Sequence, residues 1–178
     1  MSTPDKNNPH QEAKKILDHL KITQPPVPVD KVARHLGAQI RFSPFNGDIS
    51  GMIYIKDNVP IIGVNSLQHP NRQRFTIAHE CGHLVLHRDL ITREVHIDKT
   101  FPVLRRDDKS ATGTERIEIQ ANQFAAELTM PRALLLQVVK NQAIDIDDSE
   151  LVRRLAQQFK MSTEAMSVRM SNLFGSLS

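Results

Sequence analysis

The sequence has 178 residues, which is enough for one domain with a substantial hydrophobic core but not for two comfortable domains. Its 23 lysines and arginines against 20 aspartates and glutamates leave a net charge of +3, so composition forces neither a nucleic-acid nor a membrane partner. The single cysteine, Cys81, excludes an internal disulfide framework and a cysteine-rich zinc module. Five of the 8 histidines fall within residues 69–96, which marks that segment for closer inspection.

The N-terminus is polar and lacks the apolar stretch of a secretory signal. The longest apolar runs, such as residues 134–139, are far shorter than the roughly 18–20 residues of a membrane-spanning helix. Together with the lone cysteine, these features predict a cytoplasmic protein. We expect residues 1–9 to be a disordered tail and residues 10–178 to form a single domain.

The first part of the chain is expected to form helices that flank a small sheet. Apolar residues at helical spacing predict a helix over 10–21, and a proline-rich connector over 22–30 follows it. Asp30 is expected to cap a short helix that Gly37 ends. Three strands are then predicted, with a tight hairpin turn between the last two: 38–43, 49–56 and 59–64.

The central part is predicted to contain two long helices joined by a loop. His69-Pro70-Asn71 marks the start of a helix that continues to about Leu90. Residues 89–113 carry mixed charges and turn formers, which predict a loop whose length suggests a functional role. Thr112 fits the first position of a capping box for the next helix, which Pro131 ends or kinks.

The C-terminal part, about residues 149–174, is predicted to be a helical pair. Asp147 is expected to begin its first helix, and Ser162 to cap its second helix, which Gly175 ends. The pair has some helix-turn-helix character, but its second helix offers few basic or amide side chains, of which Arg169 is one. A packing helix, or one that docks a protein, is therefore favoured over a DNA-reading helix.

The sharpest motif is His79-Glu80-Cys81-Gly82-His83, an H-E-x-x-H on a predicted helix. Positions i and i+4 lie one turn apart on one helix face, so two imidazoles there can bind one ion. Glu80 lies about 100° around the helix from His79, beside the ion, where it can take a proton from a metal-activated water. The motif therefore predicts a metallohydrolase site.

Catalytic zinc usually has three protein ligands, and the motif supplies two. His87 continues the histidine stripe, but it lies about 12 Å along the helix from His79, too far for one ion. Asp89 has the spacing of an H-E-x-x-H-x-x-G-x-x-H/D protease, but Leu86 replaces the glycine of that pattern. Glu118 could face the histidines from the next helix, although a first-turn acid is usually a surface charge that complements the helix dipole. Spacing alone leaves these alternatives open.

The chain resembles the ImmA/IrrE family of metallopeptidases, which are gluzincin-like, over almost its whole length, residues 10–175. RQRFTIAHECGHLVLH at 72–87, followed by E-x-x-A-N-x-F-A-A-E-L-x-M-P at 118–131, carries most of the resemblance. The segments 26–37 and 155–173 resemble the family's N-terminal segment and C-terminal helical pair. Cys81 and Thr129 replace common leucines of the family pattern, as core changes that we expect to be tolerated.

The resemblance implies that His79, His83 and Glu118 bind one Zn²⁺ and that Glu80 is the catalytic base. It also implies a substrate, a helix-turn-helix transcriptional repressor whose cleavage relieves repression of mobile-element or stress-response genes. The expected fold class is α+β, with a small antiparallel three-stranded sheet packed on the H-E-x-x-H helix and a C-terminal helical subregion. The alternative function is a catalytically inactive module that binds a regulator or DNA.

Several other residues near the motif are candidates for supporting roles. Tyr54 on a strand, together with His87 and His96, is a candidate for stabilising an oxyanion, and a half-buried strand aromatic is an equally good interpretation of Tyr54. Asn122 is a candidate to support a metal ligand. Cys81 lies on a different helix face from the histidines, so buried packing is favoured over a redox role.

Overall fold

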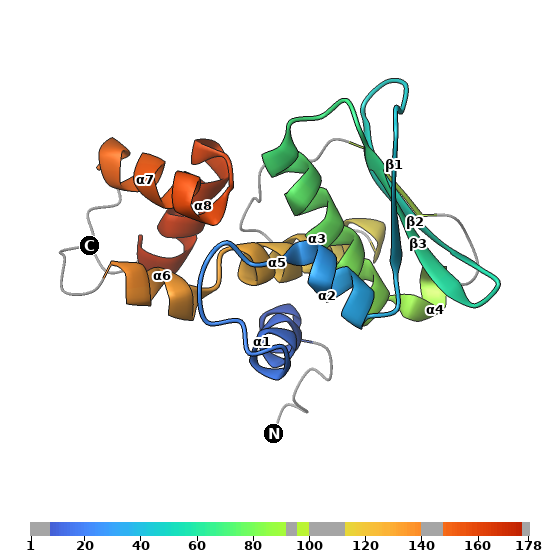
Figure 1. Cartoon of the computed structure of the whole chain (residues 1–178), viewed down its shortest axis with the longest axis horizontal. Coiled ribbons are helices and arrows are strands. Elements are labelled where there is room, and N and C mark those ends of the chain that lie inside the picture. Colours follow the sequence, from blue (N-terminus) through green and yellow to red (C-terminus); the bar gives the residue numbers. More distant parts are fainter. Residues whose placement is uncertain (1–7, 92–95, 100–112, 140–147, 176–178) are drawn as a thin grey trace.

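The computed structural model describes residues 8–91, 96–99, 113–139 and 148–175 (Figure 1). It confirms an α+β fold with a sheet packed on the H-E-x-x-H helix and a helical C-terminal region. The elements in chain order are α1 (Pro9–His19), α2 (Val29–His35), β1 (Gln39–Ser43), β2 (Ile49–Lys56), β3 (Val59–Asn65), α3 (Pro70–Leu86), α4 (Arg88–Ile91), β4 (His96–Lys99), α5 (Gly113–Thr129), α6 (Arg132–Val138), α7 (Ser149–Phe159) and α8 (Thr163–Phe174).

The sheet differs from the expected three antiparallel strands, because it is mixed and has four strands among the described residues, in the order β1-β3-β2-β4. β2 and β3 form the predicted antiparallel hairpin, and Asp57 and Asn58 both have positive φ in its turn. β1, however, pairs with β3 in parallel. β2 and β3 run in opposite directions, and β3 has the same direction as β1. The sequence of a strand does not by itself encode its direction relative to its neighbours.

The prediction of a loop over residues 89–113 is wrong in part, because two regular elements lie in this segment. The chain forms the short helix α4 and then β4, which pairs antiparallel with β2. The predicted cap Thr112 lies outside the described residues. β4 has only four residues, too few for an alternating pattern to distinguish it from a loop.

Helix starts follow local hydrogen bonding. Asn8 caps α1, which begins at Pro9, so these two residues are not part of the expected tail; residues 1–7 lie outside the described part. Asp30 is in the first turn of α2 and is not its cap, since the N-cap position is Pro28. Asp148 caps α7, whereas the predicted Asp147 lies outside the described residues.

α3 is the central element of the fold. It contacts β2 and β3 on one side and α5 on another, and α1 packs against α5 (Figure 1). The face of the sheet towards α3 is apolar, with Ile53, Ile62 and Val64 in the core. α3 is therefore held by core contacts along most of its length, and its central turns, including the motif, are buried.

The C-terminal pair α7–α8 lies at the other end of the molecule from the sheet (Figure 1). A partly buried ion pair attaches it to the rest of the fold: the buried Arg169 of α8 binds Glu127 of α5 and also donates from Nε to the carbonyl oxygen of Met130 at 3.0 Å. His10 of α1 lies 3.4 Å from the same Glu127 carboxylate. Among the described residues, no helix has the length and apolar character that a membrane crossing requires.

Candidate metal centre

His79 and His83 lie one turn apart on α3 and are almost completely buried, with 0% and 1% of their surface exposed. Their Nε2 atoms are 2.8 Å apart, and the rings meet edge to face. Burial on a packed helix restricts both side chains to few rotamers. The two nitrogens are therefore held towards one point, as ligands of a single ion require.

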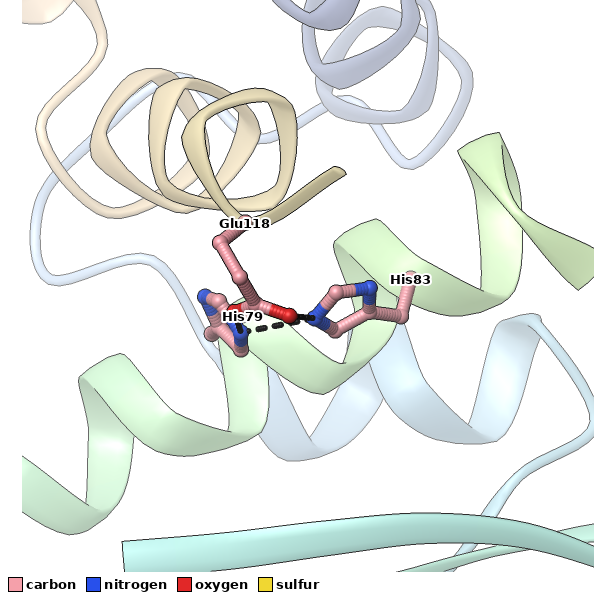
Figure 2. A group of neighbouring side chains, drawn as sticks. All are labelled: His79, His83 and Glu118. Carbon is pink, nitrogen blue, oxygen red and sulfur yellow. Dashed lines mark hydrogen bonds and ion pairs between the residues drawn. The ribbon is translucent and has the colours of Figure 1, made fainter. Parts of the chain in front are cut away.

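Glu118 reaches the histidine pair from α5, as Figure 2 shows. Its Oε2 lies 3.4 Å from Nε2 of His79, and its Oε1 lies 3.4 Å from Nε2 of His83. Among the described residues, these three side chains form the one group of histidine, cysteine, aspartate or glutamate whose ligand atoms all lie within 4.8 Å of one another. The alternatives Asp89, which is exposed on α4, and His87 are not part of it.

The donor set fits a divalent ion such as zinc. Two ligands at about 2.0–2.1 Å from one tetrahedral ion are about 3.3 Å apart, which is close to both nitrogen–oxygen separations. The nitrogen–nitrogen separation of 2.8 Å is shorter, so binding an ion requires the imidazoles to move apart by about half an ångström. Two imidazoles and one carboxylate are also the ligands of many catalytic zinc sites, which keep a fourth position open.

Asn122 orients one of the ligands. It lies one turn after Glu118 on α5, and its Oδ1 is 3.0 Å from Nδ1 of His79. An amide oxygen can only accept, so Nδ1 of His79 carries the proton and Nε2 presents its lone pair towards Glu118. This contact gives the sequence candidate Asn122 a definite geometry, that of a residue that supports a ligand from behind.

Glu80 lies between α3 and the sheet and is completely buried. A Cβ atom built on Gly51 of β2 would stand 3.1 Å from Oε1 of Glu80 and 2.4 Å from Cγ2 of Thr76. Only a glycine at position 51 therefore leaves room for the Glu80 carboxylate against the strand. The role of Gly51 cannot be predicted from the sequence, because the contact joins two segments that are distant in sequence.

Gly82, inside the motif, allows α3 and α5 to approach closely. A Cβ atom there would lie 3.1 Å from the carbonyl oxygen of Ala121 and 3.1 Å from Cδ1 of Phe124. This close contact places Glu118 within reach of the histidines. Gly82 was visible in the motif, but its role depends on which helix packs against it.

The remaining candidates lie in different places. A side chain at position 51 would face α3, so alternation along β2 puts Tyr54 on the opposite face of the sheet, away from the metal centre. His87 is partly buried at the end of α3, with its ring centroid 5.7 Å from that of His83. The backbone of His96 pairs with Ile53, and its side chain lies outside the described part.

Cys81 is completely buried in the hydrophobic core. Burial, with a smaller contribution from the nearby Glu80 carboxylate, raises the pKa of its thiol far above the usual range. A thiol with a raised pKa does not form the reactive thiolate at neutral pH, so the buried packing role is the one that the structure favours.

An α+β domain that holds H-E-x-x-H on one helix and a third ligand, a glutamate, on a second helix packed against it has the design of a metallopeptidase. The family model of Peptidase M78, described as the IrrE N-terminal-like domain, matches residues 33–171, and the chain belongs to this family. This match confirms the ImmA/IrrE resemblance and supports a metal-dependent peptidase role.

One similar solved structure is described as a Mycobacterium tuberculosis transcriptional regulator. It is 18% identical in sequence and superposes with a TM-score of 0.60 over 94% of this chain, which corresponds to 48% of the regulator. The chain thus spans about half the length of that protein, and the similarity concerns the fold alone. No curated protein sequence matches this chain.

Proposed function

We propose that the protein is a zinc-dependent endopeptidase. The observation that carries this proposal is the convergence of His79, His83 and Glu118 on one point, with Glu80 buried beside them on the same helix as the histidines. When bound by these three residues, zinc supplies a Lewis acid that makes water nucleophilic at neutral pH.

The chain's own residues supply the proton transfer. The Glu80 carboxylate accepts the proton of the attacking water and delivers it to the amide nitrogen of the leaving segment. Its burial and its contact with the glycine backbone of β2 limit its movement, so it is positioned before the substrate arrives. Asn122 keeps His79 in the tautomer in which the lone pair of Nε2 can bind a metal ion.

The experiment combines metal analysis with four variants. Wild type is expected to hold one Zn²⁺ per chain, whereas Glu118→Gln loses it and Glu80→Gln keeps the ion but cleaves nothing. Glu115→Gln makes the same change three residues earlier, at an exposed position of α5, and serves as the control. Zinc loss in Asp89→Ala but not in Glu118→Gln would transfer the third-ligand role to Asp89, and absence of stoichiometric metal in wild type would refute the proposal.

The proposed substrate is a helix-turn-helix transcriptional repressor, and the proposed outcome is relief of repression. Family membership supports this proposal. The test is to combine the purified protein with the regulator encoded beside it and to follow the regulator's mass. Fragments that appear with wild type but not with Glu80→Gln are expected, whereas an intact regulator with both would refute this substrate.

The alternative, a binding module without catalysis, predicts that Glu80→Gln acts like wild type on the regulator. Direct reading of DNA by α8 is not favoured by the structure. Arg169 is the only lysine or arginine of this helix, and it is buried against Glu127. A recognition helix presents its basic side chains to the DNA.

A further inference from the structure

A cleft of about 530 Å³ lies beside the metal centre, between α3, α5 and the start of α8. This size is within the range of about 300–1,000 Å³ that is common for small-ligand sites. Its apolar lining comes from all three helices and the turn before α8, and includes Phe75, Ala126, Met130, Met161 and Val168. The C-terminal helical pair therefore forms one wall of the cleft. The other two walls are α3 and α5, the helices that also carry the metal ligands.

Asn122 connects the cleft to the metal centre, although none of the three metal ligands lines the cleft itself. This residue lines the cleft and also accepts the hydrogen bond from His79. Glu118, Asn122 and Ala126 of α5, and Met130 just after its end, recur every four residues. They form a stripe with steps of about 6 Å that turns about 40° around the helix axis at each step. A chain bound at the metal can thus extend along this stripe into the cleft.

The two arginines that line the cleft are engaged elsewhere. Arg169 binds Glu127 and the carbonyl oxygen of Met130, and Arg72 donates to Oγ of Ser50 at 3.2 Å. Glu164 is exposed to solvent. Apolar groups supply most of the cleft's exposed lining, so the favourable occupant is apolar.

We propose that this cleft is the specificity pocket of the peptidase and that it binds a large apolar side chain of the substrate next to the bond that is cut. The inference rests on the proposed function, because it places the pocket relative to the metal. It gives the C-terminal helical pair a direct role in substrate selection, through Val168 and Met161.

The first test observes the pocket itself, with or without metal. The full chain, labelled with ¹³C at the methionine methyl groups, is titrated with N-acetyl-leucine amide and, separately, with N-acetyl-glycine amide. We expect the signals of Met130 and Met161 to move with the leucine compound alone. Met52, on the sheet face away from α3, should not respond, and the buried Met166 and Met170 report that the fold is intact. Unmoved Met130 and Met161 signals would overturn the proposal.

The second test connects the pocket to the metal. Leucine hydroxamate is expected to bind the zinc-loaded protein about 10- to 100-fold more tightly than glycine hydroxamate, the gain from burying one leucine side chain. Val168→Phe fills the pocket and should abolish this preference. Ser167→Phe adds the same ring at the neighbouring exposed position of α8, and this control variant should retain the preference for leucine hydroxamate. Ala126→Leu fills the pocket from α5 and should act like Val168→Phe.

The outcomes separate the two proposals. If neither hydroxamate binds, the zinc assignment fails, while the methyl signals still decide whether the pocket takes an apolar side chain. If both hydroxamates bind equally to wild type, or if both filled variants keep the leucine preference, the pocket assignment fails and the zinc assignment stands.

Discussion

The hydrogen bond between Asn122 and His79 should be essential for tight metal binding. Replacing Asn122 with alanine leaves Nδ1–H of a completely buried imidazole without this acceptor, while Asn122 itself is only 7% exposed. Leaving a buried donor unsatisfied costs about 1–3 kcal/mol. Losing the partner of a metal-bound histidine lowers metal affinity by about 10- to 100-fold, which corresponds to about 1.4–2.7 kcal/mol and agrees with the first figure.

The measurement is a zinc titration in competition with a chromophoric chelator, on Asn122→Ala and Asn122→Asp. The alanine variant should bind zinc about 10- to 100-fold more weakly than wild type. The aspartate variant keeps an acceptor at the same place and adds a negative charge, so it should bind at least as tightly as wild type. Wild-type affinity in the alanine variant, or an equal loss in both, would refute the role of the hydrogen bond.

Three further predictions concern packing and charge. In Gly82→Ala, the new methyl group meets the α5 backbone, which should lower the free energy of unfolding by about 1–3 kcal/mol. This loss should exceed the gain of about 1 kcal/mol from the higher helix propensity of alanine. A higher urea midpoint than that of wild type would contradict the prediction. In Gly51→Ala, the new methyl group should displace Glu80, so peptidase activity should fall while zinc is retained. Loss of zinc would contradict this prediction, because the substitution would then act on the metal ligands. Arg169→Met removes the guanidinium that pairs with the Glu127 carboxylate and should lower the free energy of unfolding by about 3–5 kcal/mol. Adding Glu127→Gln to this variant should restore most of the lost stability. A double-mutant cycle of unfolding free energies measures both effects.

The same ion pair predicts a pH dependence of stability. Burial tends to raise the pKa of the Glu127 carboxyl, but hydrogen bonds from His10 and Arg169 and the charge of Arg169 outweigh it and hold the pKa below its ordinary value. A depressed acid pKa stabilises the fold above the unfolded-state pKa of about 4.3, and the contribution is lost as pH falls through the folded pKa. Urea unfolding of wild type and Glu127→Gln should therefore converge in acid, and a constant difference would contradict the assignment.

The most local features of the protein were predictable from sequence. The motif helix, the hairpin turn at Asp57-Asn58 and the cap at Ser162 each depend on residues within about one turn of one another. For the same reason His79 and His83 could be paired, because a spacing of four on a helix fixes their relative direction. Glu118 entered through the family resemblance, since its spacing alone fitted a surface charge equally well.

The tertiary structure decided what depends on contacts between distant segments. The parallel pairing of β1 with β3, the added strand β4 and the position of Tyr54 behind the sheet follow from register and direction, which a strand's own residues do not specify. Gly51 and Gly82 became meaningful only when their neighbours across the packing were known. The periodicity of one helix places the two ligands His79 and His83 on the same face. The third ligand on α5 and the wall of the cleft on α8 belong to other helices, which only tertiary packing brings next to α3.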